Sequence, residues 1–186
     1  HGGLVAQRAA WAMAHRIASM TLIGSGAGAL GDDSREMVVR VATAAGTEGM
    51  AAAWRAAQGP VAQAPEQQGA PDSPVGEPRR ATFERDRFMA MSPEAVIGGA
   101  RNLVTAMPLG AFLRGIDFPV LVCHGDDDTT WLPHEQRLLA RRIAGARYRV
   151  IPDAVHAPAL ENPEGLLAEL LPFLESADPP TPLTRT

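Results

Sequence analysis

Three short, mostly apolar runs give the two ends of the chain a common pattern. Residues 19–23, 120–123 and 148–151 are each four or five residues long, and each is followed within two residues by Gly or Pro. Runs of that length bounded by turn residues are typical of buried strands in a parallel sheet. We therefore expect one strand near the beginning of the sequence and two near its end.

Helical patterns accompany these runs. Residues 3–15 are nearly all strong helix formers and are apolar on most faces, so we expect a helix that packs beneath other elements. A second helix is predicted from Pro133 to Ala144, where Gly145 ends it, and its apolar face is expected to contain Leu138, Leu139, Arg142 and Ile143.

The last predicted helix begins after Asn162. Asn is a favoured N-cap residue, and Pro163 suits the first helical position because its missing N–H would have no helical partner there. The pattern places one apolar stripe on this helix, formed by Leu167, Leu170, Leu171 and Leu174.

The middle of the chain has a different character. Helical patches at 35–45, 48–57 and 93–105 are interrupted by residues 59–80, which are rich in Pro, Gly, Gln and Ala and predict a loop or a disordered stretch. We interpret residues 32–112 as a helical cap inserted between two core segments, 1–31 and 113–175, with a loose tail at 176–186. The expected fold class is α/β.

Composition and charge narrow the functional classes. Hydrophobic residues make up 46% of the 186 and charged residues 20%, the balance of a globular protein, and the net charge of −4 offers no basic surface for nucleic acid or anionic lipid. All 17 basic residues are Arg, which excludes lysine chemistry. No apolar run is long enough to cross a bilayer. The single cysteine, Cys123, lies within an apolar run and is expected to be a buried core residue.

Ionisable side chains come directly after the two late strands. His124, Gly125 and three consecutive aspartates (126–128) come after the first of them, and Asp153 to His156 come after the second. Because the carboxyl ends of parallel strands meet at one edge of a sheet, an Asp and a His would emerge together there. A carboxylate at that place could orient the imidazole and stabilise its charged form. The alternative is structural: the acidic loop caps the next helix and His156 is an ordinary loop residue.

With these motifs the chain resembles the α/β-hydrolases. Residues 115–175 contain that family's C-terminal sequence of a strand, His-Gly-x-x-Asp, a helix headed by Pro, a second strand, a loop with His and a closing helix. Residues 1–26 are similar to the segment just after the family's nucleophile, namely two glycines (Gly2 and Gly3), an Ala-rich helix, and a strand ending in Gly-Ser. The resemblance implies a partial doubly wound parallel sheet, the last three strands of the α/β-hydrolase fold, with a helical lid.

The resemblance also implies roles for individual residues. It places Asp128 at the position of the catalytic acid, with Asp127 as a second choice, and His156 at the position of the general base. His1 corresponds to the residue after the nucleophile, whose backbone N–H forms half of an oxyanion hole. Asp126 is expected to be a loop or capping residue.

The nucleophile itself is expected upstream of His1, because the chain starts at the fourth position of the G-x-S-x-G elbow. Ser25 comes after a strand but lacks the sharp strand-to-helix turn of an elbow. For the remaining histidines and for Trp131 we expect structural roles: His15 and His134 on helices, His124 before its glycine, and Trp131 in core or lid packing.

The activity that the resemblance implies is hydrolysis of a small, fairly apolar carboxylic ester through a Ser-His-Asp triad, without metal or organic cofactor. Two alternatives stay open: an Asp nucleophile, as in haloalkane dehalogenases and epoxide hydrolases, and a family member that binds a ligand without turnover. We expect the missing N-terminal half of the fold and a small substrate as partners, and neither nucleic acid nor membrane.

The absent nucleophile leads to further expectations. The chain alone is expected to be inactive and poorly soluble, because the strand at 19–23 would present an unpaired edge and Leu4, Val5 and Trp11 would be uncovered. A cytoplasmic location is expected, although the sequence does not begin with Met, so a signal peptide upstream of His1 stays open.

Overall fold

The computed structural model describes residues 1–58 and 77–177. These residues form two compact units: a sheet unit of residues 1–29 and the chain from Ala106 onward, and a helical unit of residues 30–105. Residues 106–112, which the sequence pattern grouped with the helical cap, therefore belong to the sheet unit.

The sheet unit contains three parallel strands in the order β1-β2-β3, namely β1 (Met20–Ile23), β2 (Val120–Gly125) and β3 (Arg147–Ile151). Met20 pairs with Val120 in the first ladder, and Leu121 pairs with Arg147 in the second. The predicted strands are thus confirmed, and β2 continues two residues further than expected. In the part of this unit that the structure describes, the strands are accompanied by α1 (Gly2–Met13) with a short 3-10 turn at Ala14–Arg16, α6 (Gly110–Arg114), α7 (Pro133–Arg142), α8 (Pro158–Glu161) and α9 (Pro163–Ser176).

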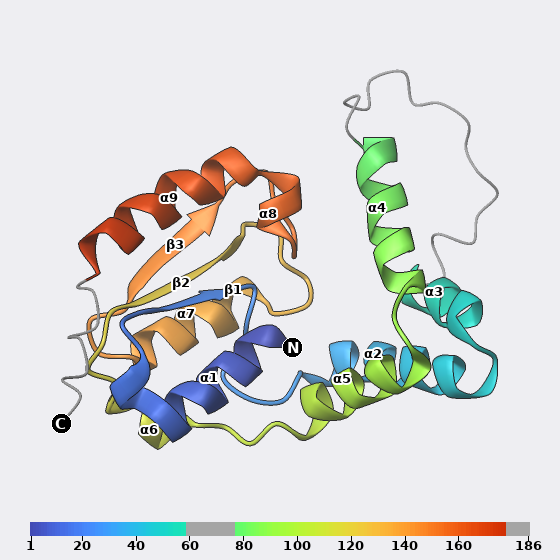
Figure 1. The fold of residues 1–186 in the computed structure, drawn as a ribbon, viewed down its shortest axis with the longest axis horizontal. Coiled ribbons are helices and arrows are strands. Elements are labelled where there is room, and N and C mark those ends of the chain that lie inside the picture. Colours follow the sequence, from blue (N-terminus) through green and yellow to red (C-terminus); the bar gives the residue numbers. More distant parts are fainter. Residues whose placement is uncertain (59–76, 178–186) are drawn as a thin grey trace, which may run out of the picture. The chain divides into compact units, whose positions relative to one another are not determined.

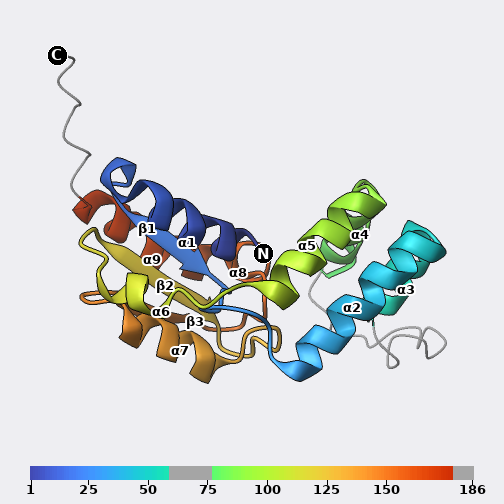
Figure 2. The same cartoon turned by 90° about the horizontal axis from the view of Figure 1, so that it is seen from below.

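Helices cover both faces of the sheet (Figure 1). Because side chains alternate along a strand, Val120 and Val122 of β2 point to one face, while Leu121 and Cys123 point to the other. The first pair lies in a core with residues of β1, α1, α6 and α7. The second pair lies in a core with Ile151 of β3 and residues of α9. In the view from below, α1 lies toward β1 and α7 toward β3, with the strands visible between them (Figure 2). Cys123 is buried, as predicted.

Two predicted helix faces are wrong by one position. In α7 the buried residues are Gln136, Leu139, Ala140 and, just after its end, Ile143, whereas Leu138 is 48% exposed. In α9 the buried residues are Leu166 and Phe173, and Leu167, Leu171 and Leu174 are each nearly half exposed. In α9 the four predicted leucines share one face, but the face that meets the sheet carries Leu166 and Phe173, with Leu170 at its margin. Asn162 caps α9 as predicted, since its side chain accepts the N–H of Gly165.

Over its described residues, 30–58 and 77–105, the helical unit has four helices, α2 (Asp32–Thr47), α3 (Met50–Gln58), α4 (Glu77–Met89) and α5 (Pro93–Thr105). Its core is small: Val41, Ala45, Ala53 and Val96 are buried together. The rings of Trp54 and Phe88 lie 5.4 Å apart between their centroids. Alanine at the contact points lets the helices approach closely.

Two predictions, the loop at 59–80 and the tail at 176–186, concern residues at or beyond the edges of the described ranges. The predicted loop at 59–80 is wrong for residues 77–80, which begin α4. Its remainder, 59–76, and most of the predicted tail, 178–186, lie outside the described residues. Among the residues that the structure describes, no helix has both the length and the hydropathy needed to cross a membrane.

Candidate active site

Three loops meet where the strands of the sheet unit end. Gly24 comes after β1, residues 126–128 come after β2, and residues 152–156 come after β3. Backbone hydrogen bonds join the first two loops to the end of the next strand, since Gly24 N–H donates to the Cys123 carbonyl of β2, and Asp126 N–H donates to the Ile151 carbonyl of β3. The strands are parallel, so all three loops lie at the carboxyl edge of the sheet, where ligand sites of open α/β sheets are found.

Asp128 and His156 come together at this edge. Nδ1 of His156 lies 3.1 Å from Oδ1 and 3.2 Å from Oδ2 of Asp128. A carboxylate can only accept, so the imidazole carries its proton on Nδ1 and leaves Nε2 as the acceptor in its neutral form. The side chain of His156 is 46% exposed and that of Asp128 is fully buried. We refer to these two residues as the acid–base pair.

The Asp128 carboxylate is held by further donors. Its Oδ1 accepts the backbone N–H groups of Thr130 at 2.9 Å and Trp131 at 3.1 Å. Burial raises the pKa of this carboxyl, but the hydrogen bond and charge of His156 and the two backbone N–H groups lower it more, so its pKa lies below the ordinary value. Asp128 is therefore an anion at neutral pH, as a partner for an imidazolium must be.

Gln136 is a third member of this network that the sequence did not reveal. It is completely buried in α7, and its Nε2 donates to Oδ2 of Asp128 at 2.8 Å and to the Trp131 carbonyl at 2.7 Å. Its Oε1 accepts the backbone N–H of Ser25 at 3.0 Å. A glutamine on a predicted amphipathic helix resembles a surface residue, and no sequence signal distinguishes it.

Glycines let the loops approach one another. A Cβ on Gly125 would stand 2.1 Å from the Ala154 carbonyl oxygen, so no side chain fits between the acid loop and the histidine loop. Gly24 has φ of +54° and lies under the His156 ring, where a Cβ would come within 3.3 Å of both Cε1 and Nδ1. The Gly-Ser pair after β1 thus forms part of the floor of the site.

The other two aspartates have different places. Asp126 accepts the backbone N–H groups of Asp153 and Ala154, so it ties the histidine loop to the end of β2, as its expected loop role implied. Asp127 is exposed, and its backbone N–H donates to the Ala154 carbonyl. Of the three aspartates, Asp128 is the one that the structure places against His156.

Glu161 holds the histidine loop from the other side. Its Oε2 accepts the backbone N–H of Val155 at 2.7 Å and that of Ala157 at 2.9 Å. Both neighbours of His156 are thereby fixed by one carboxylate from α8. This residue was also missed, because α8 is only four residues long and has no pattern of its own.

The remaining candidates lie at several places in the sheet unit. His1 lies at the N-terminal end of α1, at the end of the sheet toward which the strands point (Figure 1). Ser25 is buried, and its hydroxyl donates to the Gly26 carbonyl at 3.3 Å. His124 is buried in β2 and its Nε2 contacts the Tyr148 hydroxyl at 2.6 Å, a structural arrangement. His15 and His134 are exposed.

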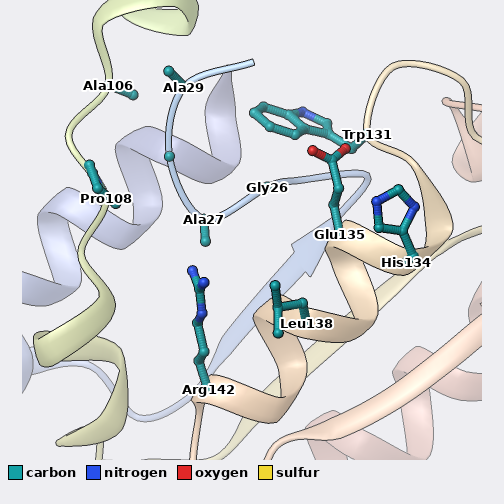
Figure 3. A pocket seen from close by; sticks show the side chains of 11 residues that line it. Gly26, Ala27, Ala29, Ala106, Pro108, Trp131, His134, Glu135, Leu138 and Arg142 are labelled. Atoms are coloured by element: carbon teal, nitrogen blue, oxygen red, sulfur yellow. The ribbon is translucent and has the colours of Figure 1, made fainter. Parts of the chain in front are cut away.

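A cavity of about 520 Å³ lies on the outer side of α7. Figure 3 shows Trp131, Leu138 and Arg142 directed toward the chain segments 26–29 and 106–108. Neither member of the acid–base pair lines this cavity. Leu138 and Arg142, expected in the core face of α7, line its wall instead. For metals, residues 1–58 and 77–177 contain no group of three or more His, Cys, Asp or Glu side chains placed to hold an ion.

Comparison with solved structures shows where this arrangement belongs. A thermophilic esterase from Thermogutta terrifontis superposes with a TM-score of 0.77 and 25% identity over 95% of this chain. The enol-lactonase from Burkholderia xenovorans superposes with a TM-score of 0.76 and 30% identity over 94%. This chain belongs to the α/β-hydrolase superfamily. Its three strands and their helices are part of that fold.

A comparison with known sequences also finds an esterase. The pimeloyl-[acyl-carrier protein] methyl ester esterase of Nitrosospira multiformis is 31% identical over 97 residues, which are 52% of this chain and 35% of that enzyme. No family model matches the sequence. This α/β-hydrolase chain spans 62% of the length of each of the two solved structures named above.

Proposed function

We propose that this chain carries the acid and the base of an ester hydrolase that cleaves small, fairly apolar carboxylic esters through a Ser-His-Asp triad. The observation that carries the proposal is the acid–base pair: a buried carboxylate with several donors, 3.1 Å from the Nδ1 of a half-exposed imidazole at the carboxyl edge of the sheet. The nucleophile would be a serine upstream of His1, and the chain alone would be inactive.

In this mechanism His156 moves the protons. Its Nε2 takes the proton of the serine hydroxyl as the oxygen attacks the ester carbonyl, and then gives it to the leaving alkoxide. Asp128 keeps the Nδ1–H tautomer in place and stabilises the imidazolium. Water repeats the sequence on the acyl-enzyme. Each step needs the ring of His156 to face the reactants, neutral when it takes a proton and charged when it gives one. The half-exposed position of His156 supplies that access.

Two further roles complete the proposal. The backbone N–H of His1 would donate one hydrogen bond to the oxyanion of the tetrahedral intermediate, since it would come directly after the nucleophile. We assign to the helical unit the role of a lid that shapes an apolar pocket for the substrate. The protein would act on a small molecule in the cytoplasm, without nucleic acid or membrane.

The named relatives support the reaction class. One is described as a methyl ester esterase, one as a thermophilic esterase and one as an enol-lactonase, and each of these names refers to a carboxylic ester bond. An Asp in place of the serine would instead favour haloalkane or epoxide chemistry on the same acid–base pair. The residue that precedes His1 in the gene distinguishes the two reactions.

The test uses the full-length protein and a nitrophenyl ester of a short fatty acid. His156→Ala is expected to reduce kcat about 10³-fold or more, by analogy with other triads, while the protein still folds and melts cooperatively. His15→Ala is the matched control, because His15 is also an exposed histidine of the sheet unit and lies on the turn after α1. Near-normal turnover by His156→Ala would remove this residue from the mechanism, and no turnover by the parent protein would contradict the esterase assignment.

A further inference from the structure

The amide of Gln136 has only one orientation that satisfies its neighbours. The Trp131 carbonyl and the Asp128 carboxylate can only accept, so both must face Nε2, and the Ser25 backbone N–H can only donate, so it must face Oε1. A flipped amide would put oxygen against oxygen at 2.7 Å and 2.8 Å in a fully buried place. The side chain is therefore locked, with both N–H bonds and the oxygen in use.

This one side chain joins the two surfaces that contact His156. Through Nε2 it holds the Asp128 oxygen that lies 3.2 Å from His156 Nδ1. Through Oε1 it holds Ser25, the residue after Gly24, and Gly24 lies against the His156 ring. A shift of Gln136 would move the carboxylate and the floor under the imidazole together.

We propose that Gln136 is the positioning residue of the acid–base pair, fixing the Asp128 carboxylate and the Gly24–Ser25 loop in one arrangement around His156. Gln136 would act through these neighbours and would not touch the substrate. The assignment rests on the proposed function for its effect on turnover, but its effect on His156 can be measured without any substrate.

The chemistry explains why a neutral amide suits this place. A neutral donor stabilises the carboxylate without cancelling its charge, so Asp128 can still favour an imidazolium. A glutamate at position 136 would retain an acceptor for Ser25 N–H but would place a second carboxyl group 2.8 Å from Asp128, where both cannot be charged without strong repulsion. An arginine or lysine would neutralise the charge that His156 requires.

A matched residue separates positioning from simple core packing. Gln7 of α1 is the other buried glutamine among the described residues, and it bonds the same loop after β1, through Nε2 to the Gly26 carbonyl at 2.9 Å and to the Ser25 hydroxyl at 3.4 Å. No hydrogen bond in the described part of the chain joins Gln7 to Asp128 or His156. A role confined to stability would give Gln7 and Gln136 variants the same phenotype.

The first measurement uses the full-length parent protein and no variant. In an NMR titration, the side-chain NH₂ resonances of Gln136 are expected to shift with the same midpoint as the His156 ring, because the amide donates to the carboxylate that faces the ring. The Gln7 side-chain resonances are the internal reference and are expected to show no such midpoint. Gln136 side-chain chemical shifts that stay constant while the His156 ring titrates would overturn the proposal.

The second measurement compares Gln136→Met with Gln7→Met. Both changes remove a buried amide while keeping a similar shape, so both are expected to lower Tm. In Gln136→Met alone, loss of the donor leaves more charge on Asp128 facing the ring, and the pKa of His156 is expected to rise by about 0.5 unit. The acid limb of the pH–rate profile of this variant should move to higher pH together with the pKa of His156. Its kcat should fall about tenfold, while its KM stays within about twofold of the parent value.

A third variant covers a failure of Gln136→Met to fold. Gln136→Leu likewise removes the donor to Asp128 with a different side-chain shape, and it is expected to raise the pKa of His156 as the methionine does. If a folded Gln136 variant keeps the parental pKa of His156, Gln136 is a packing residue only. If that pKa moves but the parent hydrolyses no ester, the positioning role stands and the proposed function fails.

Discussion

The ring of His156 rests on Gly24, a glycine with φ of +54° at the end of β1. A methyl group on this glycine would come within 3.3 Å of Nδ1, the atom that donates to Asp128. The position of the base therefore depends on a residue 132 positions away in the sequence that has no side chain (156 − 24).

We predict that Gly24→Ala impairs catalysis by displacing the imidazole. The full-length variant should lose about tenfold in kcat, because a shift of a few tenths of an ångström misaligns Nε2. It should also lose about 1–2 kcal/mol of stability from the left-handed backbone. Gly145→Ala is the control, since Gly145 has φ of +72° and nothing within 4 Å of its Cβ position. Equal kcat losses in both variants would contradict the contact with His156.

Glu161 gives a second prediction. Glu161→Ala leaves the N–H groups of Val155 and Ala157 without the carboxylate that accepts both, so the histidine loop should become mobile. The expected result is a drop in kcat of about tenfold and broadened His156 ring signals in NMR spectra. Glu164→Ala, at an exposed glutamate in the first turn of α9, should change neither. Glu161→Gln keeps an acceptor oxygen and should recover most of the activity.

The pKa of Asp128 predicts how stability depends on pH. Because the folded-state pKa lies below the ordinary value of 3.8, the anion's contribution is fully present above that value and is lost as pH falls through the folded-state pKa. Asp128→Asn should be less stable than the parent at pH 7 by about 2–3 kcal/mol, since it loses charge-assisted hydrogen bonds. The difference should shrink as the pH is lowered below 4 in urea melts. A difference that stayed constant from pH 7 to pH 2 would contradict this assignment.

Cys123 should be unreactive in the native protein. Burial, together with the negative charge of Glu169, raises the pKa of its thiol to about 11, and the side chain has no exposed surface. An aromatic disulfide reagent at pH 8 is expected to label native protein at least about 100-fold more slowly than unfolded protein, since the thiolate is the reactive form. Complete labelling of the folded protein within the time needed for the unfolded one would show that β2 opens readily.

The sequence predicts the parts of this structure that depend on repeated local pattern. Apolar runs closed by turn residues revealed the three strands, and Asn162 with Pro163 marked the start of α9, because strand burial and capping depend on neighbouring residues. The choice of buried face in α7 and α9 was wrong. Both helices have apolar side chains on more than one face, and local spacing does not say which of these faces meets the sheet.

Of the residues in the candidate site, the sequence pattern identified two and missed two. Asp128 and His156 could be singled out because the ends of parallel strands converge, whatever the side chains are. Gln136 and Glu161 could not be singled out from the sequence. Gln136 bonds Ser25, which is far away in the sequence, and Glu161 bonds a loop whose conformation no local spacing encodes. The short helices α6 and α8 were missed because helices of five and four residues are too short to show an apolar repeat at helical spacing.

The contact between Gly125 and the Ala154 carbonyl has a consequence for evolutionary drift. The distance from the acid loop to the histidine loop is set there by main chain against main chain, with no side chain between them. An exposed loop residue such as Asp127 can change without altering this spacing, whereas position 125 tolerates only the residue that lacks a Cβ. In a library of random variants selected for turnover, glycine should therefore be retained at position 125 while Asp127, two residues further on, varies freely.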